Sequence, residues 1–148
     1  MQELGATFKT VLVVEDYDDS RFMLGRLLEM CGYKVLEAAD GREAVQVAER
    51  ESPDVVLMDL QMPVLDGFTA TSIIRRMEGI SDVPVIAVSA QSSEDYVSAA
   101  RRVGCDYFVA KPVDFDELLG LVQECTEGTL ERLYDAPPKS VTGRQTSV

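Results

Sequence analysis

The chain has 148 residues, of which 46% are hydrophobic and 27% charged, and these values fit one globular domain rather than a disordered segment. Its formal net charge of −12 argues against a surface that binds nucleic-acid phosphates or anionic lipids, so we expect no nucleic-acid or membrane partner. No apolar run approaches the roughly 18–20 residues that span a bilayer. The N-terminus lacks a secretory signal pattern and the three cysteines fit reduced thiols, which together predict a cytoplasmic protein.

The chain contains no histidine, which excludes Ser-His-Asp and Cys-His catalysis and any zinc site with a histidine ligand. Three scattered cysteines cannot form a closed four-cysteine zinc site. The groups that remain for chemistry are carboxylates, hydroxyls and lysine, together with a hard cation held by oxygen atoms.

Short apolar, β-branched runs alternate with helical patterns along the whole chain. They predict buried strands at 10–14, 34–38, 55–58, 85–88 and 107–110. Acidic or hydroxyl residues that can cap a helix follow each strand. The expected helices end at about residues 31, 49, 77, 103 and 125, and their expected caps are Asp18 or Asp19, Asp40, Asp66, Ser92 and Asp114.

Five β-then-α units of about 25 residues predict an α/β fold, a doubly wound five-stranded parallel sheet with helices on both faces. We place this domain at residues 10–125, after a lead-in over 1–9. Residues 126–148 contain two adjacent prolines and many small polar residues, which favours a disordered tail. The alternative is a short helix at about 129–134 that docks on the last helix or on a partner.

Reactive side chains follow four of the five predicted strands. Glu15 and Asp16 follow the first strand, and three single residues follow later ones: Asp59, Ser89 and Lys111. Each alone has an ordinary interpretation as a helix cap, a turn residue or a surface lysine. Because the carboxyl ends of parallel strands meet at one edge of a sheet, we expect these side chains to converge there.

Crowded carboxylates without histidine favour Mg²⁺, which prefers oxygen ligands and binds phosphate oxygens in its remaining positions. A carboxylate can itself attack phosphorus and form an aspartyl phosphate. The site therefore looks built to accept a phosphoryl group, and Asp59 is the expected acceptor because it ends the central strand.

The sequence closely resembles the receiver domains of two-component response regulators over roughly residues 10–125. The resemblance rests on the order and spacing of five segments: VLVVED at 11–16, PDVVLMDLQMPVLDG at 53–67, PVIAVSA at 84–90, GCDYF at 104–108 and KP at 111–112. It implies the flavodoxin-like (βα)₅ fold with strand order 2-1-3-4-5.

The resemblance also implies roles for the acidic residues. Asp59 matches the phosphoacceptor and a Mg²⁺ ligand, and Asp16 matches a direct ligand of the metal. Glu15 would act through a bound water, and the backbone carbonyl of Gln61 matches the third protein ligand. The family more often has Asp-Asp where this chain has Glu15-Asp16.

Three further positions match the part of the family motif that responds to the phosphoryl group. Ser89 matches the hydroxyl residue that follows the phosphoryl group, and Lys111 matches its ion-pair partner. Phe108 matches the aromatic switch position, and the chain departs from the family there in having Phe rather than Tyr. The Lys111-Pro112 bond matches one that is usually cis in the family, and only an X–Pro bond adopts cis cheaply.

Two other functions compete with this interpretation. A haloacid-dehalogenase-like phosphatase also uses an aspartate nucleophile and Mg²⁺, but it needs a second Asp two residues later, where this chain has Gln61. A receiver-like interaction module that is never phosphorylated would keep the fold without the chemistry. We favour the phosphoacceptor, which is no enzyme beyond catalysing its own phosphorylation and dephosphorylation.

The expected partners follow from the same resemblance. The phosphoryl donor would be a phosphohistidine on a sensor histidine kinase or a histidine phosphotransfer protein, because this chain has no histidine. The residues after 125 are too few for an output domain, which predicts a stand-alone type of receiver. Its output would be a contact with a downstream protein, or a homodimer, through the helix at 92–103, the strand at 107–110 and the helix at 114–124.

Overall fold

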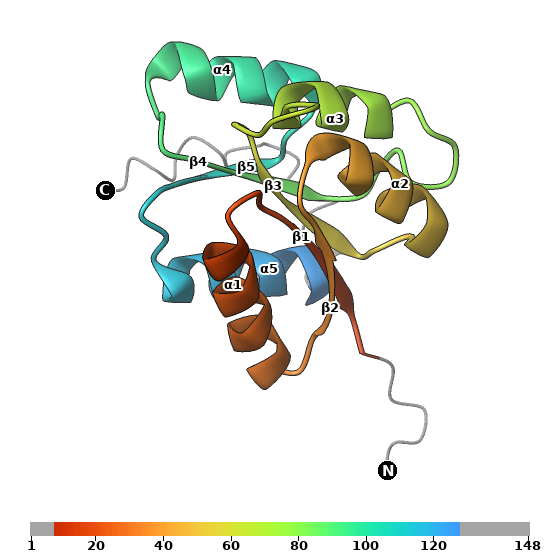
Figure 1. Ribbon diagram of the computed structural model, residues 1–148, viewed down its shortest axis with the longest axis vertical. Coiled ribbons are helices and arrows are strands. Elements are labelled where there is room, and N and C mark those ends of the chain that lie inside the picture. Colours follow the sequence, from red (N-terminus) through yellow and green to blue (C-terminus); the bar gives the residue numbers. More distant parts are fainter. Residues whose placement is uncertain (1–7, 128–148) are drawn as a thin grey trace.

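The structure is a computed structural model that describes residues 8–127 (Figure 1). Strands and helices alternate along the chain. In order they are β1 (Thr10–Val14), α1 (Asp18–Met30), β2 (Lys34–Ala38), α2 (Gly41–Glu51), β3 (Val55–Asp59), α3 (Gly67–Ile74), β4 (Val85–Ser89), α4 (Glu94–Val103), β5 (Tyr107–Ala110) and α5 (Phe115–Glu127). All five strands pair in parallel in the order β2-β1-β3-β4-β5. The predicted fold class and strand order are confirmed.

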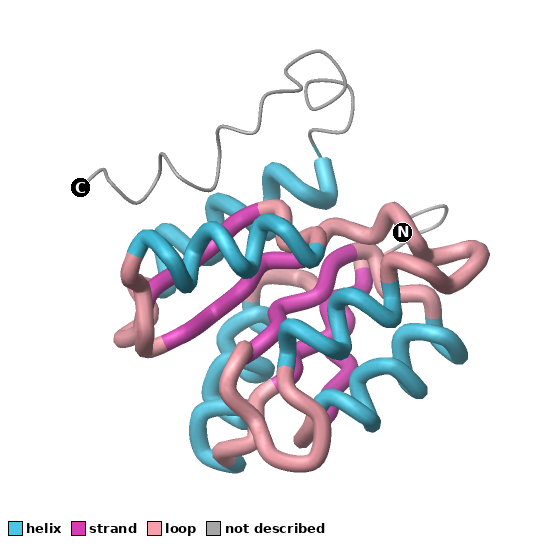
Figure 2. Tube along the Cα trace, turned by 90° about the horizontal axis from the view of Figure 1, so that it is seen from above, coloured by secondary structure: helices cyan, strands magenta, loops and turns pink. Residues whose placement is uncertain are grey.

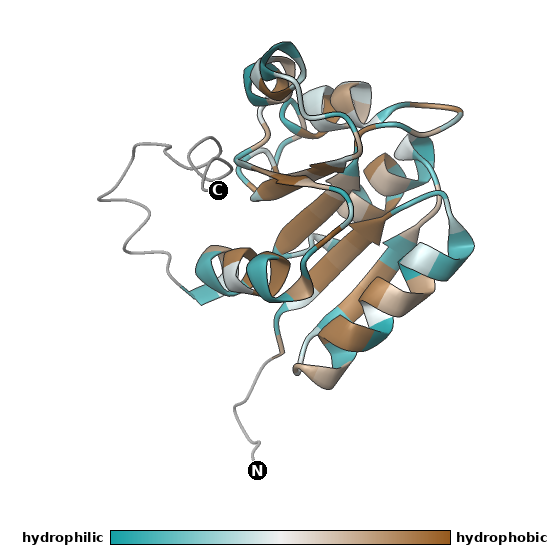
Figure 3. Cartoon of the chain, turned by 90° about the vertical axis from the view of Figure 1, so that its left-hand side faces the viewer, coloured by the Kyte–Doolittle hydropathy of each residue, from teal (hydrophilic) through white to brown (hydrophobic). Residues whose placement is uncertain are grey.

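The helices form two layers around the sheet, with α2, α3 and α4 on one face and α1 and α5 on the other (Figures 1 and 2). Alternate residues of each central strand face opposite layers. In β1, Leu12 and Val14 pack toward α2 and α3, whereas Val11 and Val13 pack with Leu28 of α1 and with α5. Strands buried on both faces explain why the strand runs are almost continuously apolar, as the hydropathy colouring shows (Figure 3).

Two strands are longer by one residue than their apolar runs indicate. β3 continues to Asp59, and β4 continues to Ser89. Both polar residues are therefore the last residues of their strands rather than the first residues of loops. Their backbones are fixed by the sheet, which holds their side chains at a defined place on its carboxyl edge.

The helix caps agree with the sequence at three helices and differ at two. Asp40 and Asp66 accept hydrogen bonds from the amides of residues 43 and 69, and Asp114 accepts one from residue 117, as expected. The cap of α4 is Ser93 instead of Ser92. At α1 the cap position is Tyr17, whose side chain makes no capping bond, and Asp18 and Asp19 lie inside the first turn. Both carboxylates still favour the positive end of the helix dipole there.

Two helix ends also differ from the sequence-based expectation. α3 ends at Ile74 instead of about residue 77, because the amides of Arg76 and Met77 bond to carbonyls three residues back and not four. α5 continues to Glu127, past the domain end expected at 125, and Thr126 is buried with its hydroxyl on the Val122 carbonyl at 2.9 Å. The expected tail helix at 129–134 lies outside the described residues, as does most of the lead-in. No helix within 8–127 is long and apolar enough to cross a membrane.

Candidate functional site

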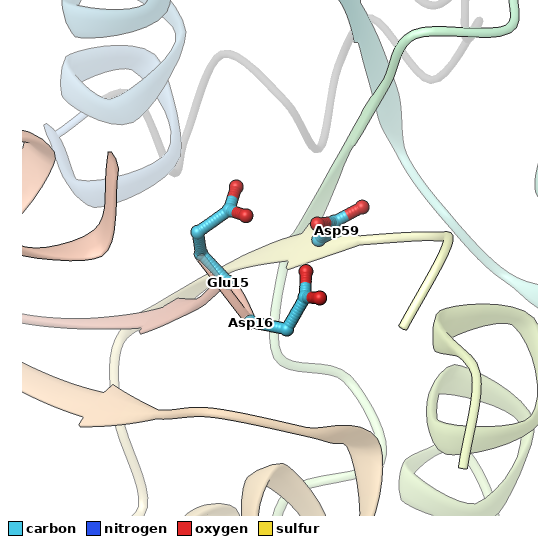
Figure 4. Close-up of side chains that lie close together, drawn as sticks. All are labelled: Glu15, Asp16 and Asp59. Carbon is cyan, nitrogen blue, oxygen red and sulfur yellow. The ribbon is translucent and has the colours of Figure 1, made fainter. Parts of the chain in front are cut away.

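The carboxyl ends of β1, β3 and β5 bring four of the expected residues together. The acidic group comprises Glu15, Asp16 and Asp59, whose carboxylates each offer an oxygen within 4.8 Å of the others (Figure 4). Lys111, just after β5, reaches the same place with its ammonium group. Glu15 and Lys111 thus lie in direct contact, although they are 96 positions apart in the sequence.

The two buried carboxylates of the site are held in the same way. Asp59 is 3% exposed, and it accepts a hydrogen bond from the Gln61 amide at 3.0 Å through Oδ1. Glu15 is 4% exposed, and it accepts one from the Tyr17 amide at 3.1 Å through Oε2. The remaining oxygens contact Lys111 Nζ, at 3.1 Å for Glu15 Oε1 and 3.4 Å for Asp59 Oδ2. Each buried oxygen therefore has a donor.

Lys111 does not neutralise the whole cluster. The pKa of Asp59 is raised from 3.8 to about 6, chiefly by burial and in part by the neighbouring Glu15, and the opposing effects of the Gln61 amide and Lys111 do not cancel the rise. Burial lowers the pKa of Lys111, but its contacts with Glu15 and Asp59 outweigh burial and raise it. One ammonium group faces three carboxylates, which leaves excess negative charge at the site.

Asp16 differs from the other two acids because its side chain is exposed. Within residues 8–127 its carboxylate makes no hydrogen bond or ion pair. A solvated carboxylate beside two buried ones, all offering hard oxygen donors, fits a cation such as Mg²⁺ that keeps several waters. Lys111 Nζ contacts Glu15 and Asp59 but makes no ion pair with Asp16, so its contacts leave the Asp16 carboxylate available.

Ser89 and Phe108 lie close to the site in the sheet but outside the cluster. Ser89 is fully buried; its hydroxyl accepts a hydrogen bond from the Gln91 amide at 3.0 Å, and its carbonyl accepts one from the Lys111 amide at 2.9 Å. Phe108 pairs with Ala87 of β4 and is 3% exposed, so its ring points inward. Among the described residues, no hydrogen bond joins the Ser89 hydroxyl to Asp59 or Lys111. The Lys111-Pro112 bond is cis, as the resemblance implies.

Two residues that shape the site were not singled out from the sequence. A Cβ at Gly67 would collide with the Asp59 carbonyl oxygen, so only glycine lets α3 begin this close to the end of β3. The signal in the sequence was Asp66-Gly67, interpreted only as a helix start. The second residue is Arg21, which lies at the end of the first turn of α1 and donates to the Glu15 carbonyl at 2.8 Å. Nothing in the sequence indicated that contact.

The comparison with known families decides the classification of this site. Residues 11–123 match the model of the response regulator receiver domain. The chain belongs to this family. Receiver domains are the phosphoacceptor modules of two-component signalling, and the acidic side chains of this receiver domain, Glu15, Asp16 and Asp59, lie together at the strand ends.

Curated relatives of this receiver domain include both long and short proteins. The chain is 39% identical to the transcriptional regulatory protein PrrA of Mycobacterium tuberculosis across 82% of its own length, but it spans only 51% of that relative. It is 36% identical to the protein PilH of Pseudomonas aeruginosa, covering 80% of this chain and 98% of PilH. The chain thus spans about half the length of some curated relatives and nearly all of others.

Solved structures resemble the receiver domain over the same region. The chemotaxis protein CheY4 of Vibrio cholerae is 30% identical with a TM-score of 0.77, over 80% of this chain and 99% of that one. The receiver domain of a sensor histidine kinase from Pseudomonas aeruginosa is 35% identical with a TM-score of 0.76, over 81% of this chain and 98% of that one. That structure is described as having a magnesium ion coordinated in its active-site cleft.

Proposed function

We propose that this receiver domain takes a phosphoryl group onto Asp59 from a phosphohistidine of a sensor histidine kinase or histidine phosphotransfer protein. The observation that carries the proposal is the position of Asp59: a buried carboxylate at the end of the central strand, 3.4 Å from Lys111 and grouped with Glu15 and Asp16. The likeness to PilH and to receiver domains of kinases supports it.

In the transfer, an oxygen of the Asp59 carboxylate attacks phosphorus while the phosphorus–nitrogen bond of the donor breaks. The electron pair of that bond returns to the imidazole, which takes up a proton. The protein's part is to position the acceptor and to stabilise charge on the phosphoryl oxygens. Lys111 already contacts Asp59 and would follow the new phosphoryl oxygens, giving up its bond to Glu15.

The acidic cluster would hold Mg²⁺ through Asp16, Asp59 and the Gln61 carbonyl, with Glu15 acting through a water. When bound, the cation neutralises charge on the acceptor carboxylate and on the phosphoryl oxygens. Asp16 is the acid whose oxygens are unengaged among the described residues, which supports direct ligation.

The reaction would be limited to the domain's own phosphorylation and dephosphorylation. A phosphatase of the haloacid-dehalogenase class needs an acid two residues after its nucleophile, and the side chain of Gln61 cannot release a proton as an acid does. A module that is never phosphorylated would have no need for a half-exposed lysine that bridges two buried carboxylates, one of them Asp59. We therefore retain the phosphoacceptor as the one function.

The readout would be a protein contact in the cytoplasm, made with a downstream target or a second copy through α4, β5 and α5. Part of this surface is mechanically tied to the strand beside the site. The Tyr107 hydroxyl of β5 donates to Glu124 of α5 at 2.8 Å, and the Lys111 amide bonds to the Ser89 carbonyl at the end of β4.

The test is labelling by acetyl phosphate, a small donor that needs no partner, followed by intact-protein mass. Wild type should gain one phosphoryl group in Mg²⁺ and none in a chelator. Asp59→Asn should gain none, and Asp16→Ala should lose labelling while staying folded. Asp82→Asn, the same change at an exposed aspartate, is the control and should label as wild type does. Labelling that persists in Asp59→Asn would refute the assignment.

A further inference from the structure

Arg21 connects three parts of the structure next to the acidic cluster. Its guanidinium donates to the Glu15 carbonyl at 2.8 Å, to Asp18 Oδ1 at 2.7 Å and to Glu37 Oε1 of β2 at 3.0 Å. The side chain is only 16% exposed. Each arm of the planar fork therefore has its own acceptor, which fixes the orientation of the group.

The carbonyl that Arg21 binds belongs to the peptide unit between Glu15 and Asp16. On the other side of Glu15, its amide donates to the Ala38 carbonyl of β2 at 3.1 Å. These two bonds hold the backbone at the point where the chain leaves β1. Asp16 itself is exposed, and none of the described residues holds its carboxylate. The direction of the Asp16 side chain is thus set by the backbone that Arg21 holds.

We propose that Arg21 is a positioning residue for the cation site: by fixing the Glu15–Asp16 peptide it aims the Asp16 carboxylate at Asp59. This inference rests on the proposed function, because it assumes that the cluster binds Mg²⁺. Mg²⁺ requires near-ideal octahedral geometry, so a ligand side chain whose orientation is not fixed lowers the affinity for the ion. Groups that orient metal ligands from outside the coordination sphere commonly change metal affinity by tenfold or more.

The direction in which Mg²⁺ affinity changes when Arg21 is replaced distinguishes a positioning role from an effect of the arginine's charge alone. Arg21 carries a positive charge near an acidic site, and its charge alone repels a cation. If the charge were all that mattered, Arg21→Gln would bind Mg²⁺ more tightly. If Arg21 positions Asp16, the same substitution weakens binding. Arg21→Lys keeps the charge but loses the three-armed fork, so it should also bind Mg²⁺ more weakly than wild type.

The experiment measures Mg²⁺ dissociation constants by following backbone amide NMR shifts in a titration without phosphoryl donor. We expect the constant to rise about tenfold in Arg21→Gln and less in Arg21→Lys. Arg26→Gln is the matched control, since Arg26 lies on the same helix and is well exposed, and its contacts are an ion pair with Glu29 and a cation–π contact with the exposed Phe22 ring, away from the acidic cluster. It should bind Mg²⁺ as wild type does.

A second readout distinguishes positioning from general damage to the fold. Asp59 and Lys111 are not contacted by Arg21, so labelling of Arg21→Gln by acetyl phosphate should return to the wild-type rate at saturating Mg²⁺. A damaged site would stay slow at any Mg²⁺ concentration. Arg21→Lys serves the same comparison if Arg21→Gln does not fold.

Failure of the inference is distinguishable from failure of the proposed function. If wild type neither binds Mg²⁺ nor labels, the proposed function is wrong. If wild type does both, and the Arg21 variants bind Mg²⁺ equally well or more tightly, the positioning role is wrong. A labelling rate that stays low in Arg21→Gln and Arg21→Lys at saturating Mg²⁺ also overturns it.

Discussion

Asp59 carries its negative charge at a cost to the fold. Its side chain is 3% exposed, and burial raises its pKa from 3.8 to about 6. An acid whose pKa is higher in the folded protein than in the unfolded chain destabilises the fold when it ionises. The folded state is therefore favoured below pH 3.8 by this group, and the advantage is lost as the pH rises to about 6. Function requires the charged form, which is the nucleophile.

Removing this titration should change how stability depends on pH. The pKa shift of Asp59 corresponds to a difference of about 3 kcal/mol in the free energy of unfolding between low pH, where Asp59 is protonated, and high pH, where it is ionised. In a chelator, we expect Asp59→Asn to gain in free energy of unfolding relative to wild type as the pH rises from 4 to 7, by an amount of that order. Urea denaturation at several pH values measures the difference.

Two comparisons control this measurement. Asp82→Asn removes an exposed carboxylate and should show a nearly constant difference from wild type across the same pH range. Adding Mg²⁺ should shrink the advantage of Asp59→Asn, because the cation stabilises the ionised aspartate. An Asp59→Asn difference that does not change with pH would contradict the burial of an uncompensated charge.

Single residues were predictable to different degrees. Asp59 and Ser89 could be placed because they end apolar runs, and the strand ends of a parallel sheet share one edge. The contact of Arg21 with Glu37, 16 residues away, depends on how α1 crosses β2, which no local pattern records. The solvent exposure of the Asp16 side chain was equally unpredictable, because the exposure of a loop residue depends on how all the neighbouring elements pack.

At the scale of elements, the end of α3 is fixed by one side chain. The Arg75 guanidinium donates to the Gly104 carbonyl at 2.7 Å, to Val83 and Ser81 carbonyls at 2.6 and 2.9 Å, and to Asp106 at 3.0 Å. These partners belong to the loop before β4 and the turn between α4 and β5. The Arg75 side chain lies where a Cβ at Gly104 would be, so glycine is needed there for space as well as for its positive φ of 112°.

Removing this group should loosen three elements at once. We expect Arg75→Ala to lower the free energy of unfolding by about 3 kcal/mol, because three partly buried carbonyls, those of Gly104, Val83 and Ser81, lose a charged donor. Arg76→Ala is the matched control, since its exposed side chain bonds only to the Ser72 hydroxyl among the described residues, and it should change stability by less than about 0.5 kcal/mol. Urea denaturation of both variants tests this, and equal losses would contradict it.

The helix limits show where local pattern stops being informative. Adjacent serines at 92 and 93 are equally good caps chemically, and the one used depends on where the chain leaves β4. Similarly, the apolar pattern of α3 continues to Met77, yet residues 75–77 turn because Arg75 binds carbonyls of other segments. The type and order of every element were predictable because strand and helix patterns alternate without interruption.

At the scale of the whole molecule, β4 connects the strand that carries the phosphoacceptor to the expected output surface. β3, which ends at Asp59, pairs with β4, and β4 pairs with β5 through Ala87 and Phe108. Phe68 of α3 and Tyr96 of α4 make an edge-to-face contact with centroids 5.1 Å apart, on the same face as the Phe108 ring. Ser89 pairs with Ala110, so a shift at the end of β4 reaches β5 of that surface directly.

The free energy that hydrogen bonds to the phosphoryl group can supply is large enough to shift an equilibrium between two conformations of the domain. Ser89 and Lys111 could each gain a hydrogen bond to a phosphoryl group, worth roughly 1.5–3 kcal/mol apiece. Moving an equilibrium from 1:99 to 99:1 takes about 5.5 kcal/mol, which is within the upper part of their sum. Phe108 already lies inward in this structure. Phosphorylation would then select this ring position from an existing population and not create it.

The coupling should fail when the Ser89 hydroxyl is removed. We expect Ser89→Ala to be labelled on Asp59 by acetyl phosphate in Mg²⁺, but to show much smaller amide NMR shifts in α4, β5 and α5 than phosphorylated wild type. Any phosphorylation-dependent self-association on that surface should be lost in parallel. Ser98→Ala, which removes an exposed hydroxyl from α4, should respond as wild type does. If phosphorylated Ser89→Ala shows the full wild-type shifts, the signal reaches α4, β5 and α5 without Ser89, and Lys111 becomes the residue that must carry it.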